Sequence, residues 1–544
     1  MPASPIDPLE GPRYMLTGRV VTMDADFGVI ESGLLCLDAG RIVGVQDAGA
    51  PLPTGFAGAP LIHTGGTIYP GLIELHNHLS YNILPIWQVP QRFTNRDRWS
   101  NHEEKRARVS GPMQLLTQQP ASGYVEAVVR YVECKCLVAG VTTSQGVTLS
   151  SAPGIIKRYR GVVRNVEATG DRKLPEAKAL IADVAAGQVE KFAKEIGRLQ
   201  EKGRVLLMHL SEGVDDRARS HFLKLQLPDG AWAINDALVG IHATALAPAD
   251  LAIMGRHGGA IVWSPLSNHL LYGGSADVAA AKAVGLLIGL GSDWSPSGSK
   301  NLLGELKVAR LVSDSLGQLF TDRELVALVT TNPARILKWH LELGSIEQGK
   351  RADLLVLAGE TGDPYGNLIG ATEAAVNLVV INGIPRYGLA GLMSEFSGQK
   401  EALTVGGSER QLFLAQPTAD TVVGTLTLGE ATRRLQLGLS QLPEPQPIPA
   451  RQRGTLSRAP GWMLVLDNDD HEAAARRPLQ PEPDEEEMAA LRAPARPLSE
   501  IVKPLPLDGL TAVDDAAYVA SFAGQGNLPE FIRTGLPQFY SRVM

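Results

Sequence analysis

Cysteine is scarce in this chain of 544 residues, which contains only Cys36, Cys134 and Cys136. Three cysteines argue against a disulfide framework and suit a reducing compartment, so we expect a cytoplasmic protein. Cys134 and Cys136 fall in the stretch 124–138, which predicts a helix. Residues two apart on a helix face different ways, so we interpret both as buried small residues and not as a thiolate pair.

Long apolar runs and basic blocks are also missing. No apolar stretch approaches the length of about 20 residues that spans a membrane, and residues 1–13 lack the basic start and apolar core of a signal peptide. The net charge is -7, so nucleic acid is not an expected partner. The composition, with 44% hydrophobic and 20% charged residues, is that of a soluble globular protein. The length of 544 residues predicts two or three domains.

The spacing of apolar runs divides the chain into regions. Short apolar runs broken by glycine over 14–66 predict a small β unit. From about residue 67, predicted strands alternate with amphipathic helices such as 189–200 and 277–284. Seven strands end near His76, Gln145, Asn165, His209, His242, Ser264 and Asp293, and 178–183 is a candidate for the eighth. This pattern predicts an α/β fold with a (β/α)8 TIM-type barrel.

Later segments complete the expected domain organisation. Two strand-like runs, 354–357 and 376–381, could rejoin the N-terminal unit. We therefore expect the following parts: a small β-sandwich domain from 1–66 plus 344–400, built from N-terminal and post-barrel segments; a metal-binding barrel over 67–343; a C-terminal extension over 401–468; a disordered linker over 469–500, rich in Pro, Glu, Arg and Ala; and a tail over 501–544 that docks as helices.

Two histidines follow the first strand of the predicted barrel. His76 and His78 come directly after the apolar residues Leu72, Ile73 and Leu75. Side chains alternate along a strand, so both imidazoles point the same way and could grip one metal ion. This motif is weak evidence by itself, because two ordinary polar histidines would give the same pattern.

Three further signals strengthen the metal interpretation. His209 with Glu212, His242 and Asp293 each follow a predicted strand. The carboxyl ends of parallel barrel strands meet on one face, where active sites lie, so these residues would converge with His76 and His78. For each of these residues taken alone, the alternative is an ordinary polar residue that caps an element or satisfies its hydrogen bonds without a function.

The sequence resembles the amidohydrolase superfamily, and within it the cytosine, guanine and triazine-type metal-dependent aminohydrolases. The resembling segments lie between about Tyr14 and Tyr387 and include 70–78, 139–143, 209–212, 241–246, 264–268, 291–293 and 344–353. Their order is specific to the superfamily, but nothing in them identifies a substrate. Beyond about residue 398 the sequence shows no functional pattern.

The resemblance implies a role for each matching residue. His76, His78, His209 and Asp293 would bind one divalent metal, zinc in the first place and iron as the alternative. Glu212 would be the general base and then the general acid. His242 would orient the water or polarise the substrate, and Asp293 would also contact the water. Segment 264–268 would shape the pocket wall.

A binuclear site is the alternative, with a carboxylated lysine bridging two metals and His242 as a ligand. Lys157, Lys173 and Lys178 lie in the right broad region, but none ends a clear apolar strand. The spacing of His209 and Glu212 also favours one metal.

The predicted function is therefore hydrolysis of a non-peptide C–N bond in a small molecule, with deamination of a heterocyclic or amidine-like compound favoured. Amide or cyclic-amide hydrolysis is the nearest alternative, and a non-catalytic assembly subunit is the second. We also expect a homo-oligomer with no nucleic-acid or membrane partner. The long loop 79–112, with Tyr81, Asn82, Trp87 and Trp99, either covers the barrel mouth or packs on the surface. The tail from Asp469 is predicted to be dispensable for chemistry, because every candidate catalytic residue precedes Lys300.

Overall fold

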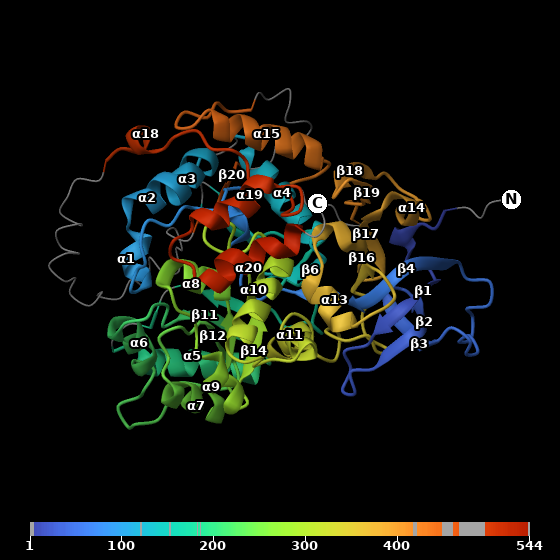
Figure 1. Ribbon diagram of the computed structural model, residues 1–544, viewed down its shortest axis with the longest axis horizontal. Coiled ribbons are helices and arrows are strands. Elements are labelled where there is room, and N and C mark those ends of the chain that lie inside the picture. The colour runs from blue at the N-terminus through green and yellow to red at the C-terminus, as the bar shows by residue number, and fades with distance from the viewer. Residues whose placement is uncertain are drawn as a thin grey trace.

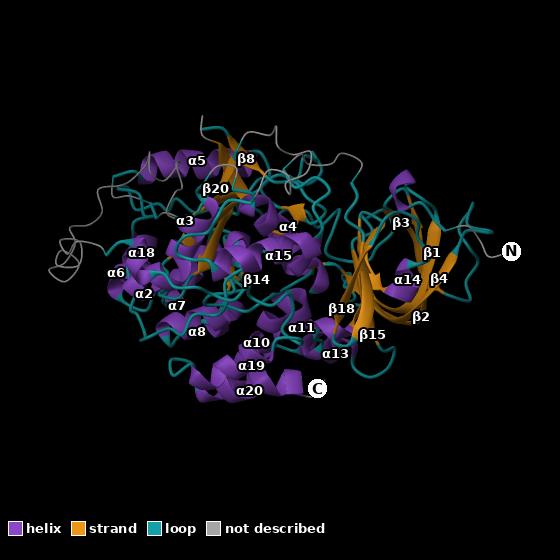
Figure 2. Ribbon diagram, turned by 90° about the horizontal axis from the view of Figure 1, so that it is seen from above, coloured by secondary structure: helices purple, strands orange, loops and turns teal. Residues whose placement is uncertain are grey.

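A computed structural model describes residues 5–119, 122–151, 154–181, 183–184, 187–416, 422–448, 461–466 and 496–541. It separates a region rich in strands, near the N-terminus, from a larger region that is rich in helices (Figures 1 and 2). Most of the linker predicted over 469–500 lies outside the described residues. No helix among the described residues is long and apolar enough to cross a membrane.

The strand-rich region is a single nine-stranded sheet. Its order is β18-β19-β17-β16-β15-β4-β1-β2-β3. The strands are β1 (Tyr14–Val21), β2 (Val29–Asp38), β3 (Arg41–Asp47), β4 (Leu61–Pro70), β15 (Leu354–Ala358), β16 (Val376–Ile381), β17 (Ile384–Leu389), β18 (Glu401–Val405) and β19 (Ser408–Leu412). Antiparallel pairing of β15 with β4 joins the N-terminal strands to the later ones, as the sequence predicts.

This sheet extends further along the chain than the expected boundary at residue 400. β18 and β19 pair with each other, and β19 pairs with β17, so the first part of the predicted extension belongs to the sheet. One apolar cluster contains Leu16, Leu354 and Leu378 from three of its strands, together with Met393 of α14 (Ala390–Met393). Burial of this shared apolar surface holds the two distant parts of the chain together.

Eight further strands form two parallel sheets that position the candidate site. One sheet has the order β5-β6-β9 and the other β10-β11-β12-β13-β14. The strands are β5 (Leu72–Ile73), β6 (Val141–Ser144), β9 (Arg164–Asn165), β10 (Lys178–Leu180), β11 (Leu206–Leu210), β12 (Leu238–His242), β13 (Ala260–Trp263) and β14 (Leu287–Leu290). The candidate eighth strand at 178–183 is β10. Strands such as Leu206–Leu210 are almost entirely apolar, and every residue in this strand is buried. Burial on both faces is typical of parallel sheets.

Two contacts link the parallel sheets at their outer strands. The amide of Ala177, next to β10, donates to the carbonyl of Val166, next to β9, at 2.8 Å. Asn77, after β5, and Asp293, after β14, form a parallel bridge. Each sheet therefore touches the other at both edges.

Helices follow most of these strands. They are α4 (Tyr124–Val138), α5 (Val189–Glu201), α6 (Asp216–Leu223), α7 (Pro248–Arg256), α8 (Pro265–Tyr272), α9 (Val278–Ala283), α10 (Leu302–Ser315), α11 (Asp322–Ala327), α12 (Thr331–Ile336) and α13 (Pro364–Gly370). The predicted helices at 124–138, 189–200 and 277–284 correspond to α4, α5 and α9. Cys134 and Cys136 are both buried in α4, as expected.

The segment 79–112 is not the featureless loop that the sequence suggests. It contains the short helices η2 (Leu79–Tyr81), α1 (Arg96–Ser100), α2 (Glu103–Lys105) and η3 (Arg106–Ser110), and α3 (Gly111–Thr117) begins at its end. Helices this short are unstable alone, so packing holds them: Tyr81, Trp87 and Trp99 are all buried.

The C-terminal segments pack onto the helical region. α15 (Leu428–Ser440) contacts α4, and β20 (Trp462–Leu464) pairs antiparallel with β7 (Thr148–Ser151), next to β8 (Ile156–Arg158). After α18 (Leu498–Ile501) come α19 (Ala516–Ser521), η8 (Phe522–Gly524) and α20 (Glu530–Ser541), and α20 lies against α10 in both views (Figures 1 and 2). The helical tail predicted from the sequence is therefore present and docked.

Candidate metal centre

The two motif histidines lie on a short backbone ladder with Asp293. The amide of His78 donates to the carbonyl of Asp293 at 2.7 Å, and the amide of Asp293 donates to the carbonyl of His76 at 3.0 Å. This exchange sets the ends of β5 and β14 side by side, although the residues are more than two hundred positions apart. Both imidazoles consequently reach the Asp293 carboxylate.

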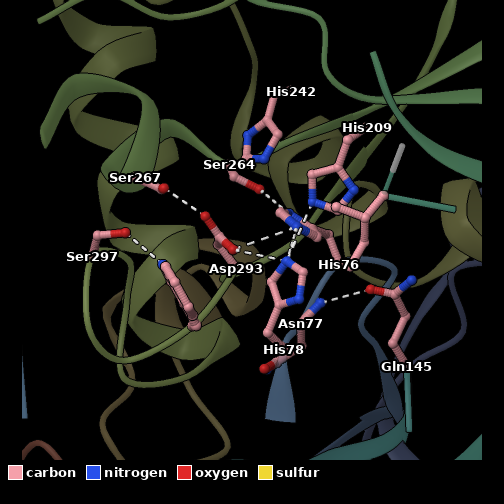
Figure 3. A network of polar contacts seen from close by, with 12 residues as sticks. His76, Asn77, His78, Gln145, His209, His242, Ser264, Ser267, Asp293 and Ser297 are labelled. Atoms are coloured by element: carbon pink, nitrogen blue, oxygen red, sulfur yellow. Dashed lines mark hydrogen bonds and ion pairs between the residues drawn. The ribbon is translucent and has the colours of Figure 1, made fainter. Parts of the chain in front are cut away.

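Four side chains bring their ligand atoms to one point (Figure 3). Nε2 of His78 lies 3.3 Å from Nε2 of His76 and 3.2 Å from Nε2 of His209. Oδ1 of Asp293 lies 3.4 Å from Nε2 of His76 and 3.6 Å from Nε2 of His78. The structure thus brings together all four ligands predicted from the sequence.

Four of the six separations among these ligand atoms are those of a tetrahedral metal ion. Bonds of about 2.0–2.1 Å to a central ion place tetrahedral ligand atoms roughly 3.3–3.4 Å apart. The four distances scatter narrowly around that value. Three nitrogens and one carboxylate oxygen are also a donor set that zinc accepts.

Other polar groups hold the ligand side chains in place. Oγ of Ser264 lies 2.8 Å from Nδ1 of His76, on the side of the ring away from the cluster. The hydroxyl of Ser267 donates to Oδ2 of Asp293 at 2.5 Å, which leaves Oδ1 facing the histidines. Partners of this kind fix the ring orientation and raise the basicity of ligands. The sequence assigned segment 264–268 to the pocket wall; in the structure, two of its serines support the ligands.

The backbone is strained at two site residues. His242 has φ 65° and Asp293 has φ 66°, both in the left-handed region that non-glycine residues rarely adopt. Such strain persists only where the surroundings enforce it, and it concentrates at functional sites. Here it turns each side chain out of its strand end and toward the cluster.

Burial controls protonation in the cluster. Desolvation, with the neighbouring imidazoles His242, His209 and His78 adding to it, keeps the pKa of His76 well below its ordinary value. Desolvation and the nearby His78 likewise lower the pKa of His209. Burial raises the pKa of Asp293 above its usual range. Neutral imidazoles offer free lone pairs, so the site is electrostatically suited to a cation.

Glu212 and His242 adjoin the ligand cluster. Nε2 of His242 lies 3.7 Å from Oε2 of Glu212, and His209, Glu212 and His242 form one of the three-residue groups whose ligand atoms lie within 4.8 Å of one another. The side-chain amide of Asn268 donates to Nδ1 of His242 at 3.2 Å, which leaves the proton of the neutral ring on Nε2, facing Glu212. Oε2 of Glu212 is buried with no hydrogen-bond partner.

Three residues surround Glu212, and two of them, Tyr272 and Arg96, are not evident from the sequence. The hydroxyl of Tyr272 donates to Oε1 of Glu212 at 2.6 Å, and the indole N–H of Trp99 donates to that hydroxyl at 2.6 Å. A guanidinium nitrogen of Arg96 lies 3.8 Å from Oε2 of Glu212. Tyr272 ends α8 and Arg96 begins α1, so neither follows a strand and no local pattern marks them.

The candidate bridging lysines interact elsewhere. Nζ of Lys178 contacts Glu195 at 2.5 Å, Nζ of Lys173 lies 3.5 Å from Glu342, and Lys157 lies over the ring of Trp462.

A cavity of about 380 Å³ opens beside the ligand cluster. His78 and His209 line it, Arg158 and Glu167 add charge, and the remaining lining mixes polar residues such as Asn77 and Gln145 with apolar ones. The lining includes Tyr81, Leu180, Ile181, Val465 and Leu466, so two residues of the C-terminal extension contribute to the wall. Of the loop residues singled out in the sequence, Tyr81 lines the cavity and Trp99 acts through Tyr272.

Comparisons with known proteins find similar hydrolases. Residues 194–385 match the Amidohydrolase family. The chain is 26% identical over 383 residues to a 5-methylthioadenosine/S-adenosylhomocysteine deaminase of Symbiobacterium thermophilum, covering 63% of this chain and 84% of that protein. It is 28% identical over 172 residues to an S-triazine hydrolase of Gordonia rubripertincta, covering 31% of this chain and 35% of that protein.

A solved structure shares the fold. The crystal structure of a triazine hydrolase variant matches with a TM-score of 0.54 at 20% identity, covering 69% of this chain and 94% of that one. The family match and the deaminase and hydrolase relatives confirm the predicted resemblance and the predicted hydrolase class. About a third of the chain, residues 194–385, therefore matches the amidohydrolase family.

Proposed function

We propose that this chain is a metal-dependent hydrolase that deaminates a heterocyclic small molecule. The observation that carries the proposal is the cluster of His76, His78, His209 and Asp293 at tetrahedral spacing, with Glu212 and His242 beside it. This arrangement joins a cation site to a buried carboxylate that can move a proton.

The metal is one divalent ion, zinc or alternatively iron, bound by those four residues. An ion held there would lower the pKa of a water molecule toward neutrality and so supply the nucleophile. The assignment to zinc rests on the nitrogen-rich donor set and the tetrahedral spacing. The three candidate bridging lysines contact Glu195, Glu342 and Trp462 instead, which supports one metal over two.

Glu212, His242 and Asp293 perform the proton transfers and orientation. Glu212 accepts a proton from the attacking water as its oxygen bonds to an sp² carbon of the substrate. It returns the proton to the leaving nitrogen as the C–N bond breaks, so that ammonia departs. His242 donates from Nε2 to the substrate and polarises it, while the carboxylate of Asp293 orients the water.

The cavity beside the cluster receives the substrate. Its apolar residues, such as Ile241 and Leu466, suit a planar ring, and its polar and charged residues, such as Arg158, suit polar groups on that ring or on a substituent. The relatives act, by their names, on adenine nucleosides bearing a sulfur substituent and on s-triazines. We therefore place the substrate among amino-substituted nitrogen heterocycles.

The finer points of the fold belong to the same proposal. The two parallel sheets, in contact at both edges, form one (β/α)8 barrel over 67–343, with the ligands at the carboxyl ends of its strands. Residues 1–66 and 344–400 form the small β domain, which the strands over 401–412 extend. The β domain, the barrel, the extension to 468, the linker over 469–500 and the tail over 501–544 remain our division of the chain. A homo-oligomer is also part of the proposal.

Metal analysis combined with a substrate screen tests the function. Purified protein should hold close to one zinc or iron per chain, lose activity with a chelator and regain it on reloading. The screen should include adenine nucleosides, aminotriazines and cyclic amides, with ammonia release as the readout. A protein without bound metal would refute the proposal, and turnover of cyclic amides alone would replace deamination with amide hydrolysis.

A further inference from the structure

The tail carries a buried carboxylate that joins two buried lysines of the helical region. Oδ2 of Asp508 lies 2.5 Å from Nζ of Lys135, in α4, and Oδ1 lies 2.6 Å from Nζ of Lys300. These three side chains are each 3% exposed or less. Asp515 also contacts Lys300, at 2.9 Å, but it is 20% exposed. The charges balance only when the tail is in place.

Backbone contacts fix the position of Asp508. Its amide donates to the carbonyl of Ile83 at 2.9 Å. Its own carbonyl accepts a hydrogen bond from the hydroxyl of Tyr131 at 2.6 Å. Asp508 therefore has one fixed orientation between α4 and the segment that follows the motif histidines.

Lys135 extends this contact to the two segments that carry metal ligands. Its ammonium donates to the carbonyl of Asn82 at 2.9 Å and to the hydroxyl of Ser295 at 3.1 Å. Asn82 follows His78 by four positions, and Ser295 follows Asp293 by two. One lysine therefore ties together the segments that leave the ligand cluster.

The same network reaches the ligand motif itself. The side-chain amide of Asn82 donates to Oδ1 of Asn77 at 2.9 Å, and the amide of Ser295 donates to Oδ1 of Asn82 at 2.8 Å. Asn77 lies between His76 and His78. Successive hydrogen bonds therefore run from the tail through Lys135 and Asn82 to the residue between two ligands.

We propose that Asp508 is a positioning residue for the metal centre, and that the C-terminal tail thereby completes a site whose ligands all precede Lys300. Through Lys135 it fixes the spacing between the His76–His78 segment and the Asp293 segment. This inference rests on the proposed metal site. It also opposes the prediction that the tail is dispensable for chemistry.

Removing Asp508 leaves two buried ammonium groups with one partly exposed partner. Burial already lowers the pKa of Lys135 to about 8 while Asp508 is present. Without that carboxylate, Lys135 either draws in water or gives up its contacts to Asn82 and Ser295. In both cases the two ligand-bearing segments lose their common anchor.

The test measures how fast the full-length, zinc-loaded protein loses zinc to a colorimetric chelator. Asp508→Asn and Lys135→Met should each speed zinc release by about tenfold or more, the scale on which outer partners of ligands act. Lys135→Met leaves Asp508 paired with Lys300. If Asp508→Asn fails to fold, the rate of zinc release from Lys135→Met alone tests the inference. Asp515→Asn is the matched control, because Asp515 contacts Lys300 but not Lys135. The rate of zinc release from this variant should stay within twofold of the wild-type rate.

Thermal unfolding of the metal-free proteins separates positioning from stability. The inference is supported if Asp508→Asn and Lys135→Met release zinc faster than the control Asp515→Asn does when the thermal midpoints of the variants and the control have fallen by the same amount. Unchanged release rates in both variants, whatever their midpoints, would make the cluster purely structural and overturn the inference. A wild-type chain that holds no metal would instead refute the proposed function, and the inference with it.

Discussion

Replacing Tyr272 by phenylalanine tests how the candidate general base is held. The change deletes the hydroxyl that donates to Oε1 of Glu212 at 2.6 Å and leaves the ring in place. Burial and the adjacent Glu212 raise the pKa of Tyr272 well above its ordinary value, so the phenol stays protonated and remains a donor. Without it, the carboxylate can rotate away from His242.

The size of the effect follows from the type of hydrogen bond. A hydrogen bond to a charged group contributes about 1.5–3 kcal/mol. Because about 1.4 kcal/mol corresponds to a factor of ten in rate, kcat should fall roughly 10- to 100-fold. Zinc content should not change, since Tyr272 contacts no proposed ligand.

A double-mutant cycle makes the assignment specific. Tyr272→Phe should have almost no further effect in a Glu212→Gln background, because residues that act as a unit are not additive. Tyr365→Phe is a matched control, since that hydroxyl binds the carbonyl of Phe27, in the nine-stranded sheet region. If Tyr272→Phe keeps kcat within twofold, or if the two losses multiply, Tyr272 does not act through Glu212.

Three further predictions concern the base, the acid sensitivity and the cavity wall. Glu212→Gln should keep its metal while kcat falls roughly 10²-fold or more, because the amide cannot accept a proton; near-normal ammonia release would show a wrong assignment. Burial lowers the pKa of His269 to about 4, whereas the pKa of an unfolded histidine is about 6.5. As the pH falls from 6.5 to 4, His269 therefore gains a proton in the unfolded chain but not in the folded one, and the free energy of unfolding decreases. Replacing His269 by leucine should remove about 3 kcal/mol of this loss in denaturant titrations at pH 7 and 4, with exposed His257→Leu as the control. Leu466→Ala should raise KM about tenfold with little change in kcat, whereas the exposed Leu437→Ala should change neither; equal kinetics for the two would exclude Leu466 from the substrate wall.

The positions of the proposed ligands could be predicted because each one follows a strand that the sequence displays locally. Apolar runs such as Leu206–Leu210 predict parallel strands, and the convergence of strand ends follows from the fold class. The left-handed backbone of His242 and Asp293 has no such signal, because glycine, the residue that adopts it most readily, stands at neither position. The direction in which these two side chains leave their strands is therefore a property of the packed structure.

The short helices after His78 show the opposite situation. Helices of three to seven residues have too few internal hydrogen bonds to be stable without tertiary contacts, so 79–112 looked featureless. Trp99 illustrates the contacts that stabilise them. It is buried, and its indole bonds to Tyr272 from 173 positions away. A sequence pattern that repeats over a few residues cannot report a pairing at that separation.

Asp508 is the hardest of the site residues to anticipate, for a physical reason. Its local sequence, Leu507-Asp508-Gly509, is typical of an exposed turn, and aspartate is rarely buried unless it is paired. Its partners, Lys135 and Lys300, lie 373 and 208 positions earlier, and each resembles a surface lysine in its own segment. Three charges that would each be unfavourable alone become tolerable only together, since burying one of them without the others leaves a charge unpaired. The role of the tail is therefore visible only when the whole chain is folded, and the zinc-release measurement on Lys135→Met tests it without disturbing the tail itself.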